Sequence, residues 1–132
     1  MSERTVATKL LIKSGDSLSL IGAGADESRL LQPLPDDVTV ASDARESTDV
    51  AVIFARSQSD LLQQSETFLG TLMATRAVWF CYPKGGRADL NRDTLIREMG
   101  GFGWRAISNV AVDDTWSAVR VRPLKPGEAP IG

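Results

Sequence analysis

Two glycines and an aspartate in the first third of the chain have the spacing of a nucleotide or cofactor site. Gly22 and Gly24 follow a short apolar run, and Asp43 follows the next one. Glycines after a strand let backbone N–H groups approach an anion, and a later acid can bind ribose hydroxyls. The alternative is a tight turn that needs glycine for its backbone angles, with Asp43 as a solvated turn residue.

A basic loop in the second half of the chain offers a different chemistry. Lys84 and Arg87 flank two glycines, and such a flexible loop could hold a phosphate or a carboxylate. Asp113 and Asp114 stand further on, and paired carboxylates can transfer protons. Neighbours at a strand end point in different directions, however, so a polar hairpin tip is the alternative for this pair. A solvated loop is the alternative for the basic residues.

The last apolar run carries an aromatic and arginine face. Trp116, Arg120 and Arg122 alternate with valines, so they share one side of a strand. Aromatic and arginine side chains are enriched in protein interfaces, which makes this face a candidate for a weak homodimer. The alternative is that Trp116 packs under a helix while the arginines extend to water, leaving a monomer.

Composition excludes several classes of protein. The 132 residues suggest one domain, and the net charge of −2 makes nucleic acid an improbable main partner. Histidine is absent and Cys81 is the single cysteine, so Ser-His-Asp and Cys-His catalysis and an internal disulfide are excluded. No metal site is expected. The N-terminus has no signal-peptide pattern and no run reaches the roughly 20 apolar residues of a membrane span, so we expect a cytoplasmic protein.

Alternating apolar runs and helical patterns predict the elements that position these residues. Strands are expected at 18–21, 38–41, 49–55, 77–82, 107–112 and 116–122. Helices are expected over 26–32, over 59–74 and from 91 or 93 to 100, after a frayed start at 1–8.

Fully apolar strands that alternate with helices predict an α/β fold with a mostly parallel, six-stranded sheet covered by helices on both faces. We expect the strand order 2-1-3-4-6-5, closed by a C-terminal antiparallel hairpin. Residues 1–122 would form this single domain, and 123–132, with three prolines, a flexible tail. The short passage over 43–48 is the weak point, because parallel crossovers normally need a dozen residues.

The pattern resembles the class I methyltransferase, or Rossmann-like, fold. The resemblance rests on residues 18–24 as a first strand with its glycine loop, on Asp43 after the second strand, and on 101–104 followed by a hairpin. It implies that Gly22 and Gly24 would approach S-adenosylmethionine and that Asp43 would bind its ribose. Residues 10–16, 82–84 and 112–117 also resemble an uncharacterised family of small bacterial proteins, which implies no established activity.

The chain departs from working methyltransferases at three places. Leu20 stands where those enzymes usually have an acid, and Asp26 replaces the third glycine of the loop. The segment after Asp43 is too short for the helices and strand that build much of the adenine pocket. We therefore expect a non-catalytic domain with no catalytic residues and no cofactor, which binds a small polar ligand or a protein. The alternative is a minimal methyltransferase that uses S-adenosylmethionine.

Any binding site should lie at the carboxyl edge of the sheet, where ligands of open α/β sheets bind. The expected site residues are Gly22, Gly24, Asp43, Lys84, Arg87, Asp113, Asp114 and Trp116, with Arg56 beside them.

Overall fold

A computed structural model describes residues 5–86 and 89–129 of the chain. The strands are β1 (Ser17–Ile21), β2 (Thr39–Ala41), β3 (Val50–Phe54), β4 (Ala77–Pro83), β5 (Trp104–Ala111) and β6 (Trp116–Pro123). The helices are α1 (Val6–Lys9), α2 (Ala25–Leu30), α3 (Gln58–Phe68) and α4 (Arg92–Gly101).

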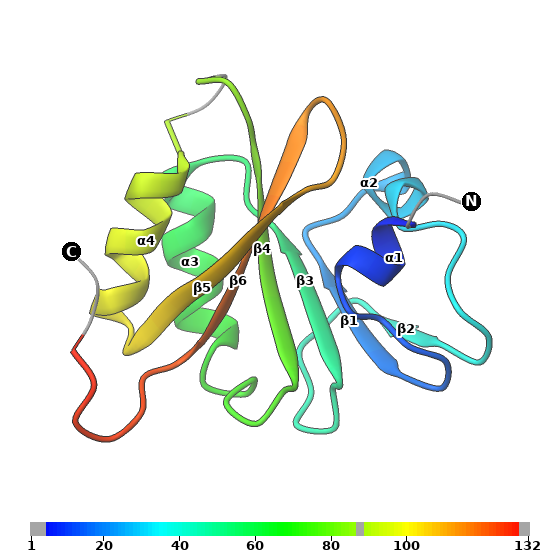
Figure 1. Cartoon of the computed structure of the whole chain (residues 1–132), viewed down its shortest axis with the longest axis horizontal. Coiled ribbons are helices and arrows are strands. Elements are labelled where there is room, and N and C mark those ends of the chain that lie inside the picture. Colours follow the sequence, from blue (N-terminus) through cyan, green and yellow to red (C-terminus); the bar gives the residue numbers. More distant parts are fainter. Residues whose placement is uncertain (1–4, 87–88, 130–132) are drawn as a thin grey trace.

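The six strands form one sheet in the order β2-β1-β3-β4-β6-β5 (Figure 1). The pairs β1–β2, β1–β3 and β3–β4 are parallel, whereas β6 is antiparallel to both β4 and β5. The predicted fold class, strand order and closing hairpin are therefore confirmed.

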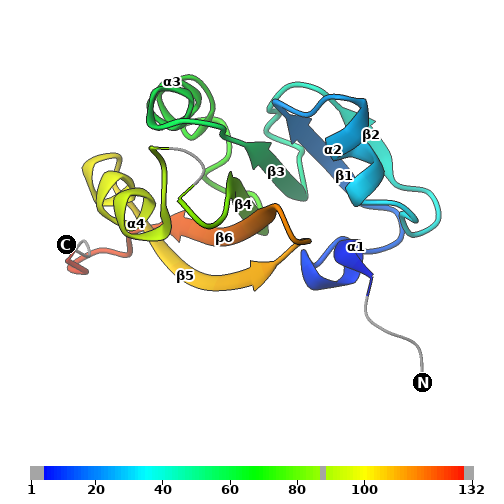
Figure 2. The ribbon, with the colours of Figure 1, turned by 90° about the horizontal axis from the view of Figure 1, so that it is seen from above.

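Two apolar cores lie on opposite faces of the sheet, with α3 and α4 on one face and α1 on the other (Figure 2). Every residue of β3 is buried, and its side chains alternate between the cores. Ala51 and Ile53 face the helical pair α3 and α4, whereas Val52 and Phe54 face α1. A strand covered on both sides has no polar face, which explains why its sequence is continuously apolar.

The short passage from β2 to β3 crosses the sheet edge without breaking the parallel topology. Thr48, which is buried, anchors it: its hydroxyl lies 2.7 Å from the hydroxyl of Ser19 on β1. The next residue, Asp49, accepts a hydrogen bond from the backbone N–H of Ser17 at 2.8 Å. The connection is thus fastened to β1, the strand that it crosses.

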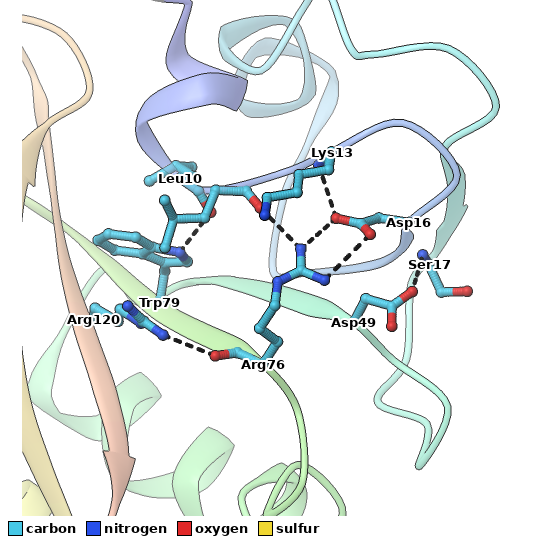
Figure 3. Close-up of polar contacts among 9 residues, drawn as sticks. Leu10, Lys13, Asp16, Ser17, Asp49, Arg76, Trp79 and Arg120 are labelled. Carbon is cyan, nitrogen blue, oxygen red and sulfur yellow. Dashed lines mark hydrogen bonds and ion pairs between the residues drawn. The ribbon is translucent and has the colours of Figure 1, made fainter.

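The expectation of a frayed start is wrong from Thr5 onward. Thr5 caps α1, and Ala7 and Leu10 are fully buried against the sheet. The indole N–H of Trp79 donates to the carbonyl of Leu10 at 2.9 Å, and Arg76 pairs with Asp16 (Figure 3). A four-residue helix is too short to give a periodic pattern, so its fixed position comes from these tertiary contacts.

The chain after β6 turns back onto the end of the sheet. The backbone N–H of Leu124 donates to the carbonyl of Gly103 at 2.9 Å. Both carboxylate oxygens of Glu128 accept from the guanidinium of Arg122 at 2.8 Å, and this hydrogen bond lowers the pKa of Glu128 to about 2. Leu124 and Glu128 thus hold this segment against the domain.

Candidate functional site

The loops after β1, β3 and β4 and the turn before β6 all lie at the carboxyl edge of the sheet, the upper end in Figure 1. Lys84 and Trp116 meet there although they are far apart in sequence. The backbone N–H of Lys84 donates to the carbonyl of Thr115 at 2.8 Å, and Pro83 pairs with Trp116 in the sheet. Among the described residues, the ammonium of Lys84 has no ion-pair partner.

Arg56 connects three of these segments. Its Nη1 donates to the carbonyl of Gly22 at 2.7 Å, and its Nη2 lies 2.6 Å from a carboxylate oxygen of Glu27. The guanidinium carbon is 5.7 Å from the centroid of the Trp116 ring, a cation–π distance. Trp116 itself is buried and packs edge-on against Phe54, with centroids 4.9 Å apart. Arg56 thus bridges the ends of β1 and β3 while its side chain stays 46% exposed.

Glu27 is the member of this cluster that sequence reasoning missed. The same carboxylate oxygen that meets Arg56 accepts the backbone N–H of Gly24 at 2.7 Å. Its side chain is only 17% exposed. The spacing of Gly24 and Glu27 is that of a capping box, which was the available signal. The N–H that could have met a ligand anion is therefore occupied by a carboxylate of the chain itself.

Gly22 has a steric role in this arrangement. Its φ is +73°, and a Cβ added there would lie 2.6 Å from the carbonyl oxygen of Phe54. Gln64 on α3 donates to that same oxygen at 3.0 Å. The end of β1 thus passes too close to β3 for any other residue, which accounts for this glycine without a ligand.

The aspartates before β6 hold the turn. Asp113 Oδ1 accepts from the backbone N–H groups of Thr115 and Trp116 at 2.9 and 2.7 Å. Asp114 is exposed beside it. Burial, together with the nearby charge of Asp113, raises the pKa of the Cys81 thiol far above its ordinary value. Cys81 therefore stays a protonated core residue rather than a nucleophile.

Asp43 forms its ion pair away from the residues around Arg56. Asp43 pairs with Arg45 on its own loop at 3.0 Å, and both side chains are exposed. Arg87 lies outside the described residues. The structure thus joins Gly22, Gly24 and Trp116 through Arg56 and Glu27, and places Lys84, Asp113 and Asp114 on the adjacent loop and turn. That these residues bind a ligand stays a prediction.

The face proposed for a homodimer makes contacts within the chain. Arg120 donates to the carbonyl of Arg76 at 2.9 Å, and Arg122 is held by Glu128. Trp116 lies beneath Arg56. A dimer through this face stays a prediction.

Neither metal ligation nor a membrane crossing is indicated by residues 5–86 and 89–129. They contain no group of three His, Cys, Asp or Glu side chains that could hold a metal ion. None of their helices combines the length and the apolar character that a crossing requires.

Known proteins match this chain in structure alone. No family model and no curated protein matches its sequence. A protein of the NADB-Rossmann superfamily from Streptococcus agalactiae aligns with all of this chain and 71% of its own, at 8% identity and a TM-score of 0.60. Sp1610 of Streptococcus pneumoniae, to which tRNA methyltransferase activity is provisionally assigned, aligns with 95% of this chain and 72% of its own. The two sequences are 12% identical, and the TM-score is 0.56.

The same Sp1610 protein in complex with S-adenosyl-L-methionine gives a TM-score of 0.55 at 12% identity, over 91% of this chain and 71% of that one. Identities this low carry the architecture and no more. The resemblance to an uncharacterised bacterial family therefore stays a prediction. The chain has a methyltransferase-like fold of the Rossmann type.

Proposed function

We propose that this chain is a non-catalytic methyltransferase-like domain that binds a small polar ligand with an anionic group at the carboxyl edge. The observation that carries the proposal is Arg56, which joins the ends of β1 and β3. Ligands of open α/β sheets bind beyond the carboxyl ends of the strands, at the point where the strand order reverses. At that point Arg56 and Glu27 of the chain itself are bonded to each other, and 46% of the Arg56 side chain stays exposed.

The residues at this edge do not fit S-adenosylmethionine. Glu27 occupies the N–H of Gly24, and Arg56 occupies the carbonyl of Gly22. Leu20 stands where an acid is expected, and the segment after β2 is too short to build an adenine pocket. Since most groups that would hold the cofactor are missing or already bonded, no catalytic step follows from this geometry.

The same edge suits an anion. Lys84 offers an ammonium without an ion-pair partner among the described residues. Arg56 is already paired with Glu27, but nearly half of its side chain is exposed, so a ligand anion could share its guanidinium. Charge-assisted hydrogen bonds to a phosphate or a carboxylate are roughly twice as strong as neutral ones. A ligand with one such group beside a small polar body is the class that these two cations would recognise.

A thermal-shift and calorimetry panel tests the proposal, with S-adenosylmethionine, S-adenosylhomocysteine, adenosine monophosphate and inorganic phosphate as probes. A probe at a hundred times its Kd adds about 2.7 kcal/mol of stability. We expect the phosphate-bearing probes to raise the melting temperature and S-adenosylmethionine to leave it unchanged. Micromolar binding of S-adenosylmethionine would instead support the alternative, a minimal methyltransferase.

The substitution Lys84→Ala separates binding from structure. We expect it to abolish the phosphate-dependent shift while the melting temperature without ligand stays nearly unchanged. Lys125→Ala is the matched control, because it removes the same charge from an exposed position on the C-terminal segment. A large fall in the intrinsic stability of Lys84→Ala would show that Lys84 is structural, and an undiminished phosphate shift would show that Lys84 does not bind phosphate.

A further inference from the structure

One edge of the sheet is formed by β5, which has a single bulge between Ala106 and Ser108 and no charge or proline beyond it. In the described part of the chain β5 pairs only with β6, so its other edge has backbone N–H and C=O groups without a partner strand. Residues 106–111 contain no charge and no proline. Natural proteins usually protect edge strands with lysines, prolines or bulges, because an open edge is a template for another strand.

The one irregularity of β5 leaves a regular stretch available for pairing. Its register against β6 shifts between Ala106 and Ser108, so Ile107 is left out of the ladder and is 40% exposed. Beyond this bulge, residues 108–111 pair in regular order with 117–120 of β6. A bulge can re-aim a side chain next to a binding site, and the regular ladder beyond it offers the hydrogen-bonding pattern that an added strand needs.

A cavity of about 150 Å³ adjoins this edge, between α4 and β5. Sites for drug-sized molecules measure roughly 300–1,000 Å³, so this cavity is too small for a cofactor and has the size for one side chain. The residues that line it are Arg92 and Ile96 of α4, Ala106 to Asn109 of β5, and Val119 of β6.

The lining selects a side chain that is apolar along its stem and acidic at its end. Arg92 and Ile96 are one helical turn apart, so they share a face of α4. Ile96 and Val119 supply aliphatic walls, and no acidic side chain lines the cavity. Arg92 has no ion pair with any described residue. Glutamate matches this combination, with methylene groups against the walls and a carboxylate that reaches the guanidinium.

We propose that β5 binds an extended segment of a partner protein, which adds a strand to the sheet and inserts a glutamate side chain between α4 and β5. Main-chain hydrogen bonds to residues 108–111 would supply affinity, and the cavity would supply specificity through the one side chain that enters it. This surface is distinct from the carboxyl edge around Lys84 and Arg56, so it goes beyond the proposed function.

An NMR titration tests this inference with a defined probe, acetyl-Thr-Val-Thr-Glu-Thr-Val-Thr-amide, followed through the backbone amides of ¹⁵N-labelled protein. We expect shifts confined to residues 104–111 and the start of α4. The same peptide with glutamine or lysine at the central position should bind about tenfold more weakly, a difference of about 1.4 kcal/mol.

The variant Arg92→Gln identifies the acid-binding group. It should remove the preference for the glutamate peptide over the glutamine peptide, whereas Arg97→Gln, an exposed charge on the same helix that does not line the cavity, should retain it. The proposal is wrong if the β5 amides do not shift at millimolar peptide, or if Arg92→Gln keeps the preference. Sedimentation of the protein alone would reveal a second copy as the occupant, which would also overturn it. Neither result bears on Lys84, so the two proposals fail separately.

Discussion

Asp16 ties the N-terminal segment to the sheet through a single carboxylate. It accepts from the Arg76 guanidinium at 2.5 Å and from the backbone N–H of Lys13 at 2.8 Å, while Arg76 also donates to the carbonyl of Leu11 (Figure 3). Burial alone would raise the pKa of Asp16, but these hydrogen bonds and the Arg76 charge outweigh it and lower that pKa below 3.8. The carboxylate is therefore more stable in the folded chain than in the unfolded one.

The substitution Asp16→Asn should destabilise the protein at neutral pH. A hydrogen bond to a charged group contributes about 1.5–3 kcal/mol, and since Arg76 is 40% exposed we expect a loss near the lower end, about 1–2 kcal/mol. Because the folded pKa is depressed, the carboxylate's contribution is present above pH 3.8 and is lost as pH falls through the lower folded pKa.

Urea unfolding at pH 7 and at pH 3 and below measures this difference. The difference in the free energy of unfolding between wild type and Asp16→Asn should become smaller as the pH is lowered. Asp26→Asn, which removes an exposed carboxylate paired with Arg29, should change stability by no more than about 0.5 kcal/mol. A gap that stays constant with pH would contradict the assigned role of Asp16.

Single residues at the carboxyl edge were predictable where topology alone decides their place. Lys84 and Trp116 lie together because strand ends in a parallel sheet share an edge, and the sequence locates those ends. The spacing from Gly24 to Glu27 indicates only the contact with the Gly24 N–H. The ion pair of Glu27 with Arg56 joins residues far apart in the chain, and no spacing in the sequence reveals it. The sequence likewise could not decide between a steric and a ligand-binding role for Gly22. The steric role becomes evident only from the position of the Phe54 carbonyl in the folded chain.

Among the elements, the ends of β1 and β3 can approach each other only because Gly22 has no side chain. Gly22→Ala would add a left-handed backbone cost of about 1–2 kcal/mol and a contact at 2.6 Å with the carbonyl of Phe54. Overpacking of this kind typically costs a further 1–3 kcal/mol or so, hence we expect a total loss of about 3 kcal/mol.

Gly103→Ala provides the matched control for this clash. Gly103 also has a positive φ, of +77°, but an added Cβ there meets nothing within 4 Å. We expect Gly103→Ala to lower the free energy of unfolding only by the backbone cost, about 1–2 kcal/mol, when both variants are unfolded in urea. Equal losses for the two variants would mean that β1 and β3 can separate at this point, and would reopen a ligand-binding role for the glycine loop.

Element boundaries followed the sequence where a strong local signal was present. Asn91 caps α4 as its side chain suggested, and the apolar runs locate β3 and β4 to within a residue. The expected helix over 59–74 ends at Phe68 and continues as turns, because Gly70 and the threonines beyond it are weak helix formers. The start of β5 at Trp104 was missed, since a strand at the sheet edge shows no continuous apolar run.

At the scale of the whole molecule, both cores share the same central strands. Alternate residues of β3 and β4 face α3 and α4 on one side and α1 on the other. The two cores therefore pack against opposite faces of the same two strands. This is why the topology could be predicted: two consecutive, fully apolar strands can only be central, and the remaining elements must cover them. What could not be predicted is the shape of the surface, which depends on the side-chain contacts at Arg56, Asp16 and Glu128.

The shared strands predict that the protein unfolds in one cooperative transition. Trp104 reports on the core under α3 and α4, whereas Trp79 and Trp116 report on the core under α1. Loss of either core would expose the buried side chains of β3 and β4, so neither should melt alone, as is usual for domains under 150 residues. Urea unfolding curves from far-UV circular dichroism and from tryptophan fluorescence should therefore share one midpoint. In a Trp104→Phe variant the fluorescence reports only on the core under α1, and the two midpoints should still coincide. Separate midpoints would mean that α1 and its core form an independent unit, in which case the contacts of Asp16 and Trp79 would stabilise that unit rather than the whole domain.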